Sequence, residues 1–544
     1  MLTGDGFAHW QPARTDEPPL RHLTCGALLD EAAASSPQHE ALAYCAYADR
    51  GLDVRWTLRD LRDRSRLVAR ALVGAGAAPG DRVAVWATNL PEWFLLQFGC
   101  AYAGVVLVPL NPLYRTSEVA YVLRTARAGM LFVEPSNRGA SLWDMAVEAA
   151  AEAPDLRRLV AIGDGGTAWQ EFLDGGADVD DAQLPAVDGD AVAQIQFTSG
   201  TTGAPKGAML RHGALTDNAR LFSRRAELPS GRAACSCMPQ FHCGGSVLAT
   251  LGALATGAPL LPLVSFDARK AIDTIDAERA ATLMAVPTML LAIETELERG
   301  GGSLTSLERI VTGGSLVPPE IARRWNDRLG VTFSITYGLT EASPVITQSS
   351  PSDPLDLQVG TVGVPLPHVE CDVASLDGLP RAVGEEGEVR VRGWQVMAGY
   401  FGDARSTQEA ITPDGWLRTG DLGRLDAGGY LHITGRAKDM IIRGGENLYP
   451  AEIEAALRAV EGVLDACVVG VPDDRYGEVP AAFVRLAPDV NSTAEAVRRA
   501  LDGRIARFKM PAHLEIVDAF PLTGSGKVQK FKLRERFMEA SLAG

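Results

Sequence analysis

The stretch Thr198-Ser-Gly-Thr-Thr-Gly-Ala-Pro-Lys-Gly207 decides how the rest of the chain is interpreted. Its glycines let the backbone turn freely and come close to a ligand, while its hydroxyls and Lys206 supply donors and a cation. Such a loop can surround phosphates with N–H groups, hydroxyls and one ammonium. The alternating residues 193–197 predict a strand just before it, which a flexible surface linker rarely has. The stretch therefore predicts a phosphate-binding loop.

Two well-known enzyme classes lack support. A Walker-type loop needs a glycine, four further residues and then Gly-Lys-Ser/Thr, whereas Lys206 follows Pro205. A second candidate, Gly524-Ser-Gly-Lys527, is followed by Val528. A P-loop NTPase is therefore disfavoured. The Gly-x-Ser-x-Gly elbow of serine hydrolases is also missing from the sequence.

Composition limits the possible partners. The chain has 544 residues, 46% of them hydrophobic, so it is long enough for two or more domains. A net charge of −16 argues against a nucleic-acid-binding face. The N-terminus lacks the pattern of a signal peptide. The uncharged run 233–266 contains several prolines and glycines, so it predicts a loop, a buried helix near 246–256 and a strand near 260–264 instead of a membrane span.

The eight cysteines are scattered along the chain, which suits reduced thiols in a cytoplasmic protein. Cys235, Cys237, His242 and Cys243 suggest a metal site, but no second Cys/His pair follows at finger-like spacing. Cys235 and Cys237 alternate along an expected strand. Buried thiols are the favoured interpretation.

Hydrophobic periodicity predicts an α/β protein. Strands are expected at 82–87, 105–110 and 130–133, with helices at 58–73, 91–103 and 117–127 between or before them. Such alternation indicates a mostly parallel sheet with helices on its faces. Residues 2–53 are expected to be irregular apart from a helix around 28–34. Strands near 388–391 and 430–434 predict a small β-rich subdomain, and strands at 440–442, 465–471 and 481–486 with helices at 450–460 and 493–507 predict a small C-terminal α+β domain.

Two further motifs carry ligand chemistry. In Tyr337-Gly-Leu-Thr-Glu341 the ring can stack on a base, the hydroxyl of Thr340 can bond a phosphate and Glu341 is a hard oxygen ligand suited to Mg²⁺. In Thr419-Gly-Asp-Leu-Gly423 an aspartate on a tight turn can accept both hydroxyls of a ribose. The structural alternative for residues 337–341 is a strand followed by a helix cap. For residues 419–423 it is a hairpin turn.

These motifs resemble those of the adenylate-forming (AMP-binding) superfamily, and with Pro521–Val528 they occur in its order and spacing. The resemblance implies a large N-terminal ATP- and acyl-binding domain (1–437) and a small mobile C-terminal domain (438–544). It implies ATP, Mg²⁺ and CoA as ligands. Catalytic roles fall on Lys527, Glu341, Thr340 and His242, with Glu341 on the metal. The implied nucleotide-binding residues are Thr198, Ser199, Gly200, Thr201, Thr202, Gly203, Lys206, Gly314, Ser315, Tyr337, Gly338, Thr340, Asp421, Arg436 and Lys527.

The resemblance assigns three further groups of residues. Phe241, His242 and Gly313 would border the acyl pocket, although a packed or helix-capping histidine is the alternative for His242. Lys438 would be the hinge. Gly444, Gly445 and Glu446 would lie beside the pantetheine tunnel of CoA, with a loop–hairpin as the alternative.

The expected activity is that of an ATP-dependent acyl-CoA synthetase. The segment 111–118 and Phe241-His-Cys243 look most like medium-chain fatty acyl-CoA ligases. An aspartate typical of amino-acid-activating domains is missing from the loop at 239–245. A fatty acyl-AMP ligase that loads a carrier protein, a luciferase-like oxygenase and an inactive binding protein stay as alternatives. A homodimer and a cytoplasmic location are also expected.

Overall fold

The structure is a computed structural model. It describes the chain except residues 5, 13–16, 46, 48–50, 164–166, 199–204, 316, 444–445, 474, 488–489, 491, 503, 523–527 and 544; the side chains of 442, 446, 447 and 540–543 are also outside the description. The chain forms two compact units. The first contains Met1, 10–371 and 391–417, and the second contains 2–9, 372–390 and 418–544. A domain boundary after residue 437 stays a prediction.

A six-stranded sheet of the first unit carries the beginning of the phosphate-loop stretch. Its order is β11-β10-β5-β4-β6-β9, and all neighbours are parallel except β10 and β11. The strands are β4 (Arg82–Trp86), β5 (Val106–Leu110), β6 (Met130–Val133), β9 (Arg158–Ala161), β10 (Val192–Thr198) and β11 (Lys206–Arg211). The predicted mostly parallel sheet is confirmed.

The other large sheet of this unit has nine strands in the order β18-β17-β16-β15-β14-β12-β13-β2-β3. Its centre is parallel and its edges are antiparallel. The strands are β2 (Glu40–Tyr44), β3 (Val54–Thr57), β12 (Ala234–Ser236), β13 (Leu260–Pro262), β14 (Thr282–Met284), β15 (Arg309–Gly313), β16 (Thr332–Gly338), β17 (Val345–Gln348) and β18 (Val364–Pro365). Expecting residues 2–53 to be irregular outside one helix was wrong at β2. Alternate alanines weaken the local strand signal there, and pairing with β13 and β3 overrides it.

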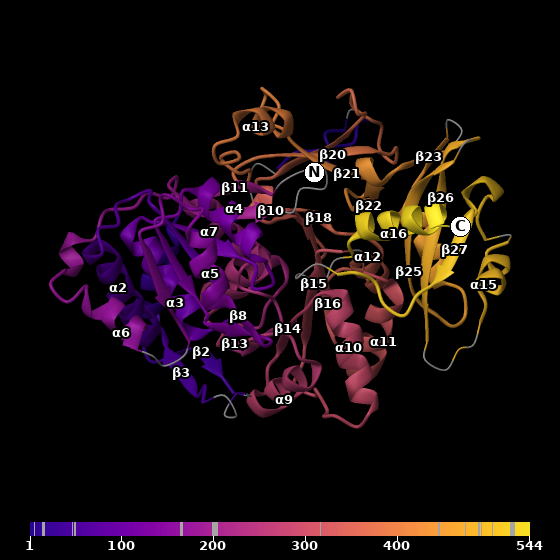
Figure 1. Ribbon diagram of the computed structural model, residues 1–544. Helices are drawn as coiled ribbons and strands as arrows, with labels where there is room; N and C mark the ends of the chain where they lie inside the picture. The colour runs from indigo at the N-terminus through magenta and orange to yellow at the C-terminus, as the bar shows by residue number, and fades with distance from the viewer. Residues whose placement is uncertain are drawn as a thin grey trace. The chain divides into compact units, whose positions relative to one another are not determined.

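Helices pack against both sheets of the first unit (Figure 1). They are α1 (Cys25–Ser35), α2 (Leu58–Gly74), α3 (Pro91–Ala103), α4 (Thr116–Ala126), α5 (Leu142–Ala150), α6 (Thr167–Asp174), α7 (His212–Arg225), α8 (Thr250–Thr256), α9 (Ala268–Glu278), α10 (Pro287–Glu298), α11 (Pro319–Leu329), α12 (Leu355–Gly360) and α13 (Ala404–Ala410). A short hairpin joins β7 (Ser136–Asn137) and β8 (Ala140–Ser141). Helices α1, α2 and α3 contact one another, and their core includes the fully buried Trp93 and Phe98. The apolar run 233–266 contains β12, a loop, a π-helix at Gly244–Ala249, α8 and β13. The helix expected near 246–256 and the strand expected near 260–264 are therefore present, and the first turns of the helix have π geometry. Among the described residues, no helix combines the length and apolar character needed to cross a bilayer.

The second unit holds two smaller sheets. The first has the order β1-β19-β20-β21-β22: β1 (His9–Trp10), β19 (Glu370–Ala374), β20 (Gly387–Arg392), β21 (Leu417–Leu425) and β22 (Leu431–Arg436). The other, drawn largely in yellow in Figure 1, contains β23 (Ile441–Arg443), β24 (Glu446–Leu448), β25 (Val463–Asp473), β26 (Gly477–Leu486) and β27 (His513–Ile516), with α14 (Pro450–Arg458), α15 (Ala494–Ala500) and α16 (Lys530–Ala543). The helix expected at 493–507 was predicted too long, since α15 ends at Ala500 with Leu501 as its C-cap.

Candidate active site

The phosphate-loop stretch begins and ends on two paired strands. Thr198, the last residue of β10, is the register partner of Lys206, the first residue of β11. The carbonyl of Pro205 accepts a hydrogen bond of 3.0 Å from the Tyr121 hydroxyl. Gly207 has no room for a side chain, because a Cβ there would lie 2.6 Å from Ile195. The two ends of the stretch are thus held side by side. The predicted ligands Ser199, Gly200, Thr201, Thr202 and Gly203 lie outside the described residues.

Glu341 faces the base of this stretch. It lies in a 3₁₀ turn, Thr340–Ala342, that follows β16, and it is 8% exposed. Its Oε1 accepts hydrogen bonds from the Tyr400 hydroxyl at 2.8 Å and from Thr198 Oγ1 at 3.3 Å. The structure therefore brings together two predicted site residues, Thr198 and Glu341, that are far apart in the sequence.

Tyr400 is a member of this cluster that sequence reasoning missed. Its ring centroid lies 5.4 Å from Lys206 Nζ, in cation–π contact, while its hydroxyl holds Glu341. Burial and the neighbouring Glu341 carboxylate raise the pKa of Tyr400, so the phenol stays a proton donor. No motif marks this residue in the sequence, because its partners come from other elements. We call Thr198, Lys206, Glu341 and Tyr400 the phosphate-side cluster.

The carboxyl ends of β15 and β16 bring two further predicted segments together. These parallel strands pair in register, with Gly313 opposite Thr336. A Cβ at Gly313 would lie 2.3 Å from the Thr336 carbonyl oxygen, and one at Gly338 would lie 1.9 Å from that of Pro344. Gly313 is buried, whereas Gly314, at φ 77°, and Ser315 are exposed and Tyr337 is half-buried. Strand ends of this kind are where α/β sheets bind ligands.

His242 acts as a helix cap in the structure. Its Nδ1 accepts a hydrogen bond from the Gly244 N–H at 3.1 Å, and its carbonyl accepts one from the Ser246 N–H at 3.0 Å, at the start of the π-helix. Phe241 and His242 are half-buried. The capping alternative is therefore observed, and pocket lining by Phe241 and His242 stays a prediction. Single-turn π-helices are frequent at functional sites.

The four residues first considered as metal ligands do not form a metal cluster in the described part of the chain. Cys235 and Cys237 are buried on or beside β12, as the thiol interpretation predicted. Cys243 donates to Gln196 Oε1 on β10 at 3.0 Å, and burial raises the pKa of its thiol to about 12.

In the second unit, Asp421 and Arg436 form an ion pair across β21 and β22. They are register partners, and Arg436 Nε lies 2.8 Å from Asp421 Oδ1. The expectation that Asp421 lies on a tight turn was wrong: residues 417–425 are one strand, and residues 421–425 pair with β22. The Asp421 side chain is 7% exposed, and the ion pair holds it in place. Two residues assigned to the ribose thus contact each other.

The hinge and CoA assignments lie further along this unit. Lys438 is in a 3₁₀ turn, Ala437–Asp439, between β22 and β23, which belong to different sheets. The backbone of Glu446 pairs with Arg443 in the hairpin of β23 and β24, the loop–hairpin alternative. Gly444, Gly445 and Lys527 lie outside the described residues.

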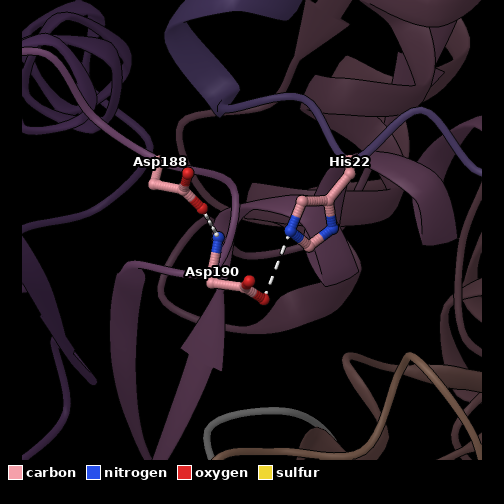
Figure 2. Close-up of side chains that lie close together, drawn as sticks. All are labelled: His22, Asp188 and Asp190. Atoms are coloured by element: carbon pink, nitrogen blue, oxygen red, sulfur yellow. Dashed lines mark hydrogen bonds and ion pairs between the residues drawn. The ribbon is translucent and has the colours of Figure 1, made fainter.

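A separate acidic group lies on the surface of the first unit. His22 Nε2 is 3.2 Å from Asp190 Oδ1, and Asp188 Oδ1 accepts the Asp190 N–H at 2.8 Å (Figure 2). All three residues are exposed. Asp190 thus contacts the distant His22 through its side chain and the neighbouring Asp188 through its backbone N–H.

Comparison with known proteins identifies two sequence families in the chain. Residues 29–401 match the AMP-binding enzyme family, and residues 452–527 match the AMP-binding enzyme C-terminal domain. The chain is 38% identical to YngI of Bacillus subtilis (strain 168), which is provisionally named an acyl-CoA synthetase, over 96% of this chain and 98% of that protein. It is 35% identical to the mitochondrial medium-chain acyl-CoA ligase ACSF2 of Rattus norvegicus, over 95% and 88%.

Solved structures share the fold. ATP-bound MatB from Rhodopseudomonas palustris superposes with a TM-score of 0.83 at 30% identity, covering 95% of this chain and 99% of that one. The Mycobacterium tuberculosis fatty acyl CoA synthetase gives a TM-score of 0.74 at 28% identity, with the same coverage.

Proposed function

The chain belongs to the AMP-binding enzyme family and is an acyl-CoA synthetase, and we propose that its acid is a medium-chain fatty acid or a related carboxylic acid. Similarity to the medium-chain ligase ACSF2 over 95% of the chain supports this substrate class. The reaction has two steps. A carboxylate and ATP give acyl-AMP and pyrophosphate, and the acyl-AMP and CoA then give acyl-CoA and AMP.

The phosphate-side cluster is the observation that carries the chemical proposal. The first step brings a carboxylate anion against the α-phosphate of ATP, so negative charges meet. Lys206 offers a cation, and Glu341 and Thr198 offer hard oxygen donors of the kind that Mg²⁺ prefers. Bound at Glu341, Mg²⁺ would neutralise phosphate charge. Fixed groups of this kind stabilise developing charge without having to reorganise during the reaction.

The remaining site residues are proposed on the strength of their motifs. Tyr337 stacks on the adenine beside Gly338, while Gly314 and Ser315 face the nucleotide from the end of β15. Asp421, aligned by Arg436, accepts the ribose hydroxyls. Thr340 bonds a phosphate, and Phe241, His242 and Gly313 border the acyl chain. Gly444, Gly445 and Glu446 accompany CoA.

The two steps use different catalytic groups. We propose that Lys527 stabilises the adenylation transition state, and that residues 438–544 rotate about Lys438 to admit CoA afterwards. The position of Lys438, in a single turn between two sheets, supports a hinge that moves without disrupting a core. A cytoplasmic location and a homodimer are further proposals. The absence of any disulfide among the eight cysteines, all of which are described, supports the first.

Lys527→Ala tests the separation of the steps. We expect acyl-adenylate formation to fall by about 10²-fold or more, because one fixed charge at the transition state is lost. Thioester formation from a supplied acyl-adenylate should stay at the wild-type rate. Equal loss of both half-reactions would contradict the role given to Lys527.

Carboxylate-dependent pyrophosphate release tests the activity and its substrate together. The panel runs from acetate to palmitate with aryl acids added, each with and without CoA. We expect release with medium-chain acids that turns over only when CoA is present. Release that stalls after one turnover despite CoA would indicate a carrier-protein ligase, and oxygen consumption or light would indicate an oxygenase. ATP binding with no release for any acid would indicate a binding protein.

A further inference from the structure

Tyr400 lies on a backbone segment, residues 398–401, that is hydrogen-bonded to β11, one of the two strands that flank the phosphate-loop stretch. Three hydrogen bonds join the segment to β11: Ala398 N–H to Met209, Met209 N–H to Gly399 and Phe401 N–H to Gly207. Tyr400 also forms a bridge with Ala208, and its N–H donates to Thr407 Oγ1 at 2.9 Å. The segment therefore behaves as an added strand. Its position relative to Lys206 is set by main-chain bonds, not by a flexible loop.

The side chain of Tyr400 reaches two opposite charges at once. Its hydroxyl donates to Glu341 Oε1, and its ring face lies under Lys206 Nζ. In the described part of the chain, no ion pair joins Lys206 to Glu341. Both hydrogen bonds to the carboxylate, from Tyr400 and Thr198, end on the same oxygen, Oε1. The second carboxylate oxygen receives none from a described residue, which suits a cation ligand.

We propose that Tyr400 is a positioning residue for adenylation, which aligns Glu341 for Mg²⁺ through its hydroxyl and holds Lys206 for the phosphates through its ring. The proposal rests on the function proposed above. Because the two contacts use different parts of one side chain, they can be removed separately. Tyr400→Phe deletes the hydroxyl and keeps the ring, whereas Tyr400→Leu deletes both.

The first unit also contains a matched control. Tyr102 donates to Asp30 Oδ1 at 2.9 Å, and its ring lies 5.1 Å from the Arg66 guanidinium carbon. These are the same types of contact, among helices α1, α2 and α3. The change in Tm of Tyr102→Phe therefore measures how much stability is lost when a half-buried phenol hydroxyl is removed away from the site.

Calorimetric ATP binding, with Mg²⁺ and separately with EDTA, measures the two contacts without the acid or the reaction. For Tyr400→Phe we expect ATP affinity with Mg²⁺ to fall about fivefold to tenfold, as for one hydrogen bond of typical net strength, and affinity in EDTA to stay unchanged. Tyr400→Leu should also weaken binding in EDTA, by about threefold, as for one cation–π contact. Tyr102→Phe should match wild type in both buffers.

Kinetics complete the test. The Mg²⁺ concentration that gives half-maximal pyrophosphate exchange should rise about fivefold to tenfold for Tyr400→Phe, while thioester formation from a supplied acyl-adenylate stays unchanged. The proposal would be overturned if Tyr400→Phe kept the wild-type dependence on Mg²⁺. It would also be overturned if Tyr400→Phe lost both half-reactions equally and its Tm fell by as much as that of Tyr102→Phe. If wild type shows no exchange with any acid, the proposed function fails, and the calorimetry still decides the role of Tyr400.

Discussion

The first unit contains two clusters built from a tyrosine, a carboxylate and a cation, and the clusters differ in how their charges are paired. We call Tyr102, Asp30 and Arg66 the helical cluster. In it, Arg66 lies 3.0 Å from Asp30 and also 2.9 Å from Asp181, so its charge is paired within the protein. In the phosphate-side cluster, the described residues form no ion pair with Lys206, and the tyrosine lies between the opposite charges. A pair that is satisfied internally serves stability, whereas separated charges beside a strand end can still serve a ligand.

The largest expected difference follows from neutralising each carboxylate. Glu341→Gln keeps an acceptor for Tyr400 but removes the negative charge, so adenylation should fall by about 10²–10³-fold with little change in Tm. Asp30→Asn should leave adenylation unchanged and lower the free energy of unfolding by about 1 kcal/mol, because its ion pair is partly exposed. Pyrophosphate exchange and thermal unfolding measure the two effects. A Glu341→Gln enzyme with full activity would remove the distinction between the clusters.

Replacing the cations should give a smaller difference in the same direction. Lys206→Met should lower adenylation by about tenfold to 10²-fold, because one of several groups that offset phosphate charge is lost. Arg66→Met should instead lower the free energy of unfolding by about 1 kcal/mol, through two partly exposed ion pairs and a ring contact. The same two assays apply. Equal effects of the two variants on adenylation would contradict the inference that only Lys206 serves the ligand.

Lowering the pH should destabilise the helices that carry the helical cluster, because His212 packs against one of them. This residue, at the start of α7, is 1% exposed, and its Nδ1 accepts the Cys25 N–H at the start of α1, the helix that carries Asp30. Burial lowers the pKa of His212 from 6.5 to about 4. The unfolded chain therefore binds the proton first as pH falls, so this contribution to stability is complete above pH 6.5 and is lost toward pH 4.

One such proton should lower the free energy of unfolding by about 1.5 kcal/mol between pH 6.5 and pH 5. Denaturant unfolding at several pH values measures the slope. His212→Asn, which keeps an acceptor but cannot take up the proton in this range, should flatten the slope. An unchanged slope in the variant would assign the acid sensitivity to other groups.

The sequence predicted the family and most of the elements that position the site. Local signals were sufficient for β10 and for α3, where strand alternation and helical periodicity agree with the observed elements. The adenylate-forming superfamily and the α/β fold are confirmed by the family matches and the solved structures. The roles of the individual site residues stay predictions.

Three of the differences share a physical cause. Tyr400, β2 and the strand through Asp421 depend on pairing with other segments, which a local pattern does not encode. The motif 419–423 has the glycines and aspartate of a turn, yet its residues 421–423 pair with β22. No local pattern marks Tyr400, because its position beside Lys206 and Glu341 is set by the hydrogen bonds between residues 398–401 and β11.

The burial of the native thiols has a practical consequence for single-molecule work. Seven of the eight cysteines are buried, and burial raises the pKa of the half-buried Cys45 to about 12, so little reactive thiolate is present at neutral pH. Cysteines introduced at Val147 and Phe531, which are 52% and 55% exposed in the first and second units, should be labelled by fluorophores while the native thiols stay silent. A donor and acceptor at these positions could follow the separation of the two units through the catalytic cycle in a chain with no native cysteine replaced.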